Sequence, residues 1–114
     1  MKNSVTFKKD SYWQARGKYS RRLNIRCKKC NHLICTYQKD GPGNLRRLYF
    51  DRIFSSKSLV DLQDKNLKKV SDLRCSNCKE ILGIPYIYVK EKRKAFRLFQ
   101  DAIIKKVIKI SHFG

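Results

Sequence analysis

Short stretches in which hydrophobic and polar residues alternate recur along most of the chain. Alternation with a period of two is typical of β-strands that bury one face. We therefore predict strands at residues 23–26, 33–38, 45–53, 67–74, 81–83 and 86–89. A glycine- and proline-containing turn separates two of them at residues 39–44, and residues 54–66 are predicted to form a loop with room for one helical turn. In the strand at 45–53, the bases Arg46, Arg47 and Arg52 should leave the core face to Leu48 and its neighbours.

The pattern at residues 91–110 fits two structures. Phe96, Phe99, Ile103 and Val107 recur at spacings of three and four, which favours an amphipathic helix. Ile104, Lys106, Ile108 and Ile110 alternate, and the β-branched residues among them favour a strand. The fold class predicted is mainly β, with small antiparallel sheets held by a metal ion, and a C-terminal helix is the alternative for residues 91–110.

The first 22 residues are polar and basic, with scattered aromatics. We predict a basic N-terminal arm at residues 1–22, followed by a single metal-binding domain at residues 23–114. A chain of 114 residues buries only a modest core, so a metal ion or a disulfide bond would help to stabilise it.

Two Cys-x-x-Cys motifs are separated by 44 intervening residues, and each lies between predicted strands, as a zinc-ribbon or knuckle architecture requires. We call them the first knuckle, Cys27–Cys30, and the second knuckle, Cys75–Cys78. Zinc is bound tetrahedrally by four thiolates, and a tight turn brings both sulfurs of such a pair to one ion. We therefore predict a Zn²⁺ ion held by Cys27, Cys30, Cys75 and Cys78. Four thiolates leave no position for an activated water, so the ion is assigned to folding rather than to catalysis.

The alternatives for the knuckles are four small core cysteines, a redox Cys-x-x-Cys pair or an iron–sulfur cluster. A redox pair would need a thioredoxin-like βαβ context, which the pattern lacks. The fifth cysteine, Cys35, lies in the apolar run LICTYQ and is predicted to be a buried thiol. His32 is a substitute ligand only if a cysteine is missing, and His112 is expected to be an exposed tail residue. Asn31 follows the first knuckle, where a positive φ is often required and asparagine tolerates it.

The formal net charge is +19, from 28 bases and 9 acids. Residues 1–30 and 90–114 are strongly basic, whereas the middle of the chain is nearly balanced. If the two ends meet in the fold, they form one positive face. Such an excess favours a polyanionic partner, and nucleic acid is preferred over a membrane surface or a merely soluble charged protein.

No stretch resembles a signal peptide or a membrane span, so we expect a cytoplasmic protein whose cysteines are reduced. No Ser-His-Asp set, paired-carboxylate site or phosphate-binding loop is visible, which argues against an enzyme.

Bases interleaved with aromatics are the candidate contacts to RNA, because bases neutralise phosphate and aromatics stack on nucleobases. Tyr49 and Phe96 are nevertheless predicted to pack in the core. The predicted nucleic-acid contacts are Lys18, Arg21, Arg22, Lys28, Lys29, Arg46, Arg47, Lys92, Arg93, Lys94 and Arg97. The predicted function is a non-catalytic RNA- or ribosome-associated module, and a protein-interaction adaptor is the alternative.

Two knuckles joined by a β-rich insert resemble the β-tent group, which includes Yippee-like proteins and the ligand-binding domain of cereblon. Methionine-R-sulfoxide reductases share the two-knuckle arrangement. The second knuckle carries the most specific local likeness, because it is followed by Leu82-Gly83 and an aromatic residue. The resemblance implies two antiparallel sheets that meet at the zinc end, with strands at 95–99 and 103–110 instead of a helix. Reductase chemistry is not implied, because no cysteine follows Cys78, and the tryptophan cage of cereblon has no counterpart in the matched region.

Overall fold

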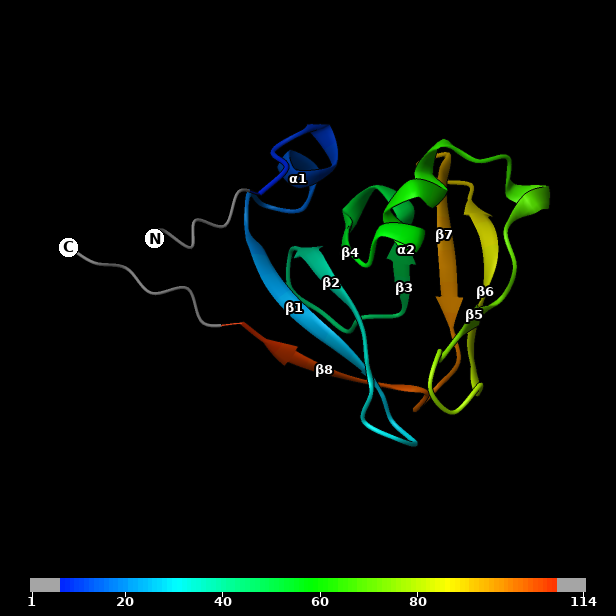
Figure 1. The fold of residues 1–114 in the computed structure, drawn as a ribbon. Helices are drawn as coiled ribbons and strands as arrows, with labels where there is room; N and C mark the ends of the chain where they lie inside the picture. The colour runs from blue at the N-terminus through cyan, green and yellow to red at the C-terminus, as the bar shows by residue number, and fades with distance from the viewer. Residues whose placement is uncertain (1–6, 109–114) are drawn as a thin grey trace.

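Two four-stranded antiparallel sheets form the protein (Figure 1), in a computed structural model that describes residues 7–108. Sheet A has the order β4-β2-β1-β8 and sheet B the order β3-β7-β6-β5. The strands of sheet A are β1 (Ser20–Cys27), β2 (Leu33–Asp40), β4 (Ile53–Ser55) and β8 (Ile103–Val107). Those of sheet B are β3 (Arg47–Tyr49), β5 (Leu73–Arg74), β6 (Ile81–Tyr88) and β7 (Arg93–Leu98). The predicted mainly β class is confirmed, and the helical alternative for residues 91–110 is wrong over the described part, which forms β7 and β8.

Over residues 7–108, the chain crosses between the sheets four times. It passes from β2 to β3, back to β4, over again to β5, and finally from β7 to β8, which runs away from sheet B in Figure 1. The β8 strand pairs with β1, with Ile25 opposite Lys105 and Cys27 opposite Ile103. Within the described residues, parts of the two basic ends, β1 and β8, therefore lie side by side in sheet A.

The hydrophobic core lies between the sheets. Sheet A contributes Leu23 and Ile25, and sheet B contributes Leu48, Leu82 and Phe96. The Tyr49 backbone N–H in β3 donates a hydrogen bond to the hydroxyl of Tyr37 in β2, at 2.9 Å, which ties the sheets together. Tyr49 and Phe96 are buried, as predicted.

Four predicted strands, at residues 45–53, 67–74, 81–83 and 86–89, differ from the structure. Residues 45–53 do not form one strand, because the short 3-10 helix η1 (Phe50–Arg52) turns the chain from β3 in sheet B to β4 in sheet A. In the 67–74 segment only β5 is extended, and it is preceded by the 3-10 helix η3 (Leu67–Lys69). The two short strands predicted around Pro85 are one strand, β6. Pro85 lies beyond the end of β5, where the outer edge of β6 has no neighbouring strand to require its missing N–H.

The segments outside the sheets are short helical turns. They are α1 (Ser11–Ala15), α2 (Lys57–Val60) and η2 (Asp61–Asp64). None of the helices within residues 7–108 is long and apolar enough to cross a membrane. Within the segment predicted as an arm, residues 7–22 contact the domain, since α1 precedes β1 and Tyr12 stacks under the guanidinium of Arg93 at 4.0 Å.

A buried network of arginines and carboxylates corrects the prediction that Arg52 faces solvent. Arg52 is 0% exposed, and it donates hydrogen bonds to Asp40 at 3.0 Å and to Asp10 at 2.6 Å. Arg93 is also buried, and it binds Asp51 at 2.6 Å and Glu91 at 3.1 Å. The hydrophobic pattern could not identify these two arginines, because their burial depends on carboxylates that are distant in the sequence.

Candidate metal centre and basic groove

The two knuckles are built by the same local structure. Each begins at the end of a strand, and a register shift precedes its first cysteine, with Arg26 opposite Leu33 and Arg74 opposite Ile81. In the first knuckle the Cys27 N–H donates to His32 O at 2.9 Å, and the Asn31 N–H donates to Cys27 O at 2.8 Å.

The second knuckle repeats this geometry 48 residues later. The Cys75 N–H donates to Glu80 O at 2.9 Å, and the Lys79 N–H donates to Cys75 O at 3.0 Å. Asn31 has a φ of 64° and Lys79 a φ of 68°, so the positive φ predicted after the first knuckle is confirmed and also occurs after the second. The arginine before each knuckle donates to the carbonyl that follows it, from Arg26 to Asn31 at 3.0 Å and from Arg74 to Lys79 at 3.2 Å.

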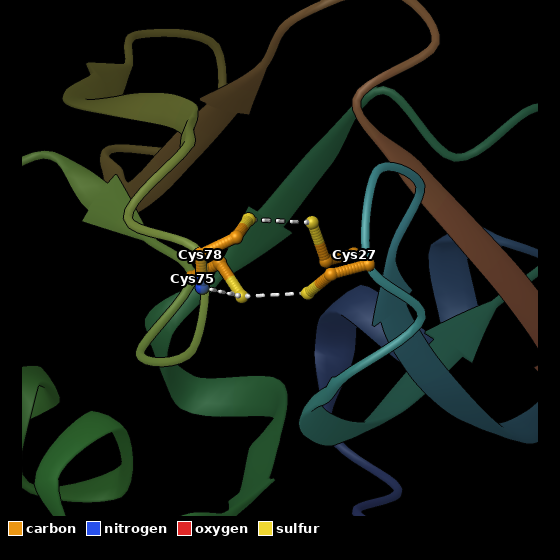
Figure 2. A group of neighbouring side chains, drawn as sticks. Cys27, Cys75 and Cys78 are labelled. Carbon is orange, nitrogen blue, oxygen red and sulfur yellow. Dashed lines mark hydrogen bonds between the residues drawn. The ribbon is translucent and has the colours of Figure 1, made fainter.

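The four knuckle cysteines converge on one point. Their sulfur atoms all lie within 4.8 Å of one another. The Sγ atoms of Cys27 and Cys78 are 3.6 Å apart and those of Cys30 and Cys75 are 3.5 Å apart, and Figure 2 shows Cys27 facing Cys75 and Cys78 across the gap between the two loops. These separations are too long for disulfide bonds, in which the sulfurs lie about 2.05 Å apart. The predicted cluster is therefore confirmed as four cysteines positioned to bind a metal ion.

Hydrogen bonds favour a thiolate at one of these positions. The side chain of Asn77, and after it the backbone N–H of His32, lower the pKa of Cys30 to about 6. Cys35 lies outside the cluster, and burial raises its pKa to about 12. Cys35 is thus the buried core thiol that the sequence predicts.

Further contacts join the knuckles around the sulfur cluster. The Nε2 atom of His32 lies 3.1 Å from Ser76 Oγ, so His32 is not one of the clustered ligands. Lys29 forms an exposed ion pair with Glu80 at 3.4 Å. The backbone N–H of Lys28 donates to Ala102 O at 3.1 Å, which attaches the first knuckle to the turn between β7 and β8. His112 lies outside the described residues.

The predicted nucleic-acid contacts divide into two groups. Arg22 and Arg93 are buried, with Arg22 stacked 3.9 Å from the ring of Phe54, and Lys94 donates to the carbonyls of Gln63 and Lys65. These three side chains have internal roles. The exposed members of the predicted set are Lys18, Lys28, Lys29, Arg46, Lys92 and Arg97, and Arg21 and Arg47 are half-buried.

Three of the predicted bases, Arg46, Arg47 and Arg97, meet in one groove of about 940 Å³. We call it the basic groove and define it by Arg46, Arg47, Tyr86, Arg97, Phe99 and Lys105. Its walls come from the β2–β3 loop, β3, β6, β7, the β7–β8 turn and β8. Tyr86, Phe99 and Lys105 were not among the predicted contacts, although the Tyr-Ile-Tyr-Val run after Pro85 could have indicated Tyr86 as an aromatic contact.

Comparisons of the chain with protein-family models, with curated proteins and with solved structures find no match. The two-knuckle arrangement therefore rests on the structure of this chain, and no matching family supports membership of the β-tent group.

Proposed function

We propose that the metal is Zn²⁺ and that its role is structural. A tetrahedral four-thiolate site with Zn–S bonds of about 2.3 Å places its sulfurs about 3.8 Å apart. The cross-knuckle separations of 3.5 Å and 3.6 Å are close to this value without any rearrangement of the backbone. Four cysteines fill the shell, so the site offers no open position for substrate or water. Cysteines that are not joined by disulfides stay reduced in a reducing compartment, which for this protein we propose to be the cytoplasm.

We further propose that the protein is a non-catalytic RNA-binding module, associated with RNA or with a ribonucleoprotein such as the ribosome. The observation that carries this proposal is the unneutralised positive charge. Ion pairs among the described residues engage only four bases, Arg16, Lys29, Arg52 and Arg93, although these bases use five of the nine acids. Because 28 bases face only nine acids, most of the positive charge cannot be neutralised within the chain, and a polyphosphate backbone would supply the missing negative charge.

RNA is preferred over a membrane because exposed bases and aromatics share one groove. Arg46, Arg97 and Lys105 lie beside Tyr86 and Phe99. The basic side chains can bind phosphates, and the aromatic rings can stack on nucleobases.

Fluorescence anisotropy of a dye-labelled RNA titrated with the full-length protein tests the proposal. Binding should weaken steeply as salt rises, because each phosphate neutralised releases about 0.7–0.9 counterions. Supercharged proteins also bind RNA weakly, so an unrelated globular protein of matched net charge is the control. The proposal fails if the RNA is not bound at about 0.05 M salt, or if it is bound no more tightly than by the control protein.

A protein-interaction adaptor is the second candidate, and the outer edge of β6 favours it. The strand β5 pairs with residues 81–83 of β6, and no other strand within residues 7–108 pairs with the rest of that edge. Ile84, Ile87 and Val89 are exposed beside it. Open edges with apolar neighbours are sites at which another chain can add a strand. Capture from a native lysate separates the two candidates, since a protein partner survives nuclease and moderate salt whereas an RNA partner does not.

A further inference from the structure

The basic groove is electropositive because its bases lack acidic partners. Among the described residues, no carboxylate forms an ion pair with Arg46, Arg97 or Lys105. Asp101 is the one acid among the groove residues. The pKa of the neighbouring Lys39 is affected by the same excess of positive charge. Burial is the main cause that lowers it, and the positive charges of Arg21 and Lys105 lower it further. A phosphate entering the groove would therefore meet attraction from several sides.

Arg47 is held in position at the base of the groove. Its Nε atom donates to the hydroxyl of Tyr86 at 2.8 Å, and its guanidinium lies 4.1 Å from the centroid of the Tyr88 ring. The strand register explains this arrangement. Arg47 in β3 and Ile84 in β6 both lie opposite Arg97 in β7, and Tyr86 and Tyr88 follow Ile84 by two and four residues, so they lie on the same face of β6. Directly opposed residues share a face of the sheet, so arginines and tyrosines from three strands line the same surface. An arginine fixed in this way loses little side-chain entropy when it binds.

The aromatic residues of the groove are accessible to a flat ligand. Phe99 is 45% exposed although it is fully apolar, and Tyr86 is partly exposed. Every nucleobase has a π-face that can stack on such a ring. The bases of a duplex are already stacked on one another, whereas those of a single strand are free to turn toward the protein.

The metal centre supports one end of the groove. The backbone N–H of Lys28 in the first knuckle binds the carbonyl of Ala102, which lies between Asp101 and Ile103 of the groove wall. Cys27 is also the register partner of Ile103. A metal ion bound by both knuckles would therefore also fix the position of β8 relative to sheet B.

We propose that the basic groove is the binding track for single-stranded nucleic acid, with phosphates on Arg46, Arg97 and Lys105 and a base stacked on Phe99. This inference rests on the proposed RNA-binding function and assigns it to one surface and to one class of strand. Its volume of about 940 Å³ lies near the upper end of the range for pockets that enclose small ligands, about 300–1,000 Å³, so it can hold a short stretch of strand.

The first experiment removes the groove charges. The groove variant is Arg46→Gln/Arg97→Gln/Lys105→Gln. The matched control is Lys57→Gln/Lys68→Gln/Lys69→Gln, which removes three exposed charges from α2 and η3, outside the groove. Equal metal content and equal thermal midpoints establish that both variants are folded. The probes are a labelled single-stranded RNA of mixed sequence, the DNA strand of the same sequence, and the RNA annealed to its complement.

In the groove variant, the slope of log K against log salt for single-stranded RNA should fall in magnitude by about 2, since each lost phosphate contact removes about 0.7. The corresponding loss of affinity at about 0.1 M salt is about 100-fold. The control should keep the slope of the wild type within the error of the measurement. The wild type should bind single strands more tightly than the duplex, and the DNA arm decides whether the 2′-hydroxyl contributes.

The second experiment removes the stacking ring without changing charge. Phe99→Leu should weaken binding of the single strand by about fivefold or more and leave the salt slope unchanged. The matched control is Tyr19→Leu, because Tyr19 is exposed to a similar extent and lies outside the groove.

The outcomes separate this inference from the proposed function. If the wild type binds RNA with a steep salt dependence but the groove variant and its control are equal, the groove is not the track, although RNA binding stands. Equal or tighter binding of the duplex overturns the assignment to single strands. If the groove variant instead loses a nuclease-resistant protein partner and no RNA, the groove is a protein-docking surface. Failure of the wild type to bind any of the three probes removes both proposals.

Discussion

Replacing Cys75 by serine removes one of the four converging sulfur ligands and tests the role of the metal centre. Cys75 is 0% exposed and begins the second knuckle, so its sulfur reaches the ion from within the core. We expect the variant to lose its bound Zn²⁺ and a large part of its stability. The physical reason is that the ion is the cross-link between two loops that are distant along the chain.

The magnitude follows from the length of the loop that the ion closes. The sulfur pairs that face each other across the knuckles are 51 and 45 residues apart in the sequence. A cross-link closing a loop of this size removes about 4 kcal/mol of chain entropy from the unfolded state. A chain of 114 residues has a free energy of unfolding of roughly 6–17 kcal/mol, so the loss is a quarter of the total or more. At roughly 4 °C per kcal/mol for a domain of this size, the thermal midpoint should fall by about 15 °C or more.

The assay combines metal analysis with thermal unfolding. Elemental analysis of the purified, reduced protein should find one zinc per chain in the wild type and substantially less in Cys75→Ser. Circular dichroism in the same buffer gives the thermal midpoints. Should Cys75→Ser not accumulate in folded form, titration of the wild type with a chelator replaces it, and loss of the β signal should then follow release of the metal.

The matched control is Cys35→Ala. Cys35 is also buried, but its sulfur lies outside the cluster and burial keeps the thiol protonated by raising its pKa to about 12. This variant should keep its zinc and lose only about 1 kcal/mol, because a small core group is deleted. Metal-free wild-type protein, or a Cys75→Ser variant with an unchanged midpoint, would refute the reasoning.

Four further predictions follow from the charges and the backbone contacts. Arg52→Ala should cost about 3–5 kcal/mol in urea unfolding, because the Asp40 carboxylate, 4% exposed, loses its partner; a cost below 1 kcal/mol would contradict this. Burial opposes ionisation of Asp10, but the hydrogen bonds from Arg52 and from the Trp13 N–H, together with the charges of Arg52 and Arg93, outweigh it and lower the pKa of Asp10 from 3.8 to about 2. The ionised Asp10 therefore contributes its full stabilisation above about pH 4, and this stabilisation is lost as the pH falls toward 2. Over this pH range the thermal midpoint should fall more steeply in the wild type than in Asp10→Asn, and parallel curves of midpoint against pH would contradict this. Gly83→Ala should lower the midpoint, at a cost of about 1–3 kcal/mol, because a Cβ atom there would lie 2.6 Å from the backbone oxygen of Arg97; an unchanged midpoint would mean that β6 and β7 separate freely. Raising the salt concentration from about 0.01 M to about 0.1 M should raise the midpoint of the free protein, since screening over roughly 10 Å weakens the self-repulsion of a net charge of +19, and a fall would show that ion pairs dominate instead.

The local patterns of the sequence were sufficient for the metal centre and for the first hairpin. A Cys-x-x-Cys turn holds two sulfurs in a geometry that four or five residues define by themselves, so Cys27, Cys30, Cys75 and Cys78 could be identified without knowledge of the fold. Alternation likewise predicted the hairpin of β1 and β2. The choice between helix and strand at residues 91–110 came from the family resemblance, because the two periodicities overlap there.

Only the tertiary structure decided which bases are available to a partner. Arg93 and Arg46 are indistinguishable as sequence letters, yet Arg93 is buried against Asp51 whereas Arg46 is exposed in the basic groove. The cost of burying a guanidinium is offset only by carboxylates that the fold delivers from elsewhere in the chain, and no local pattern encodes that delivery. No local pattern encodes the groove either. It forms because the chain returns to sheet A at β8, which brings Lys105 into one groove with bases of sheet B. Local spacing thus determined the metal ligands, and long-range packing determined the surface that the protein presents.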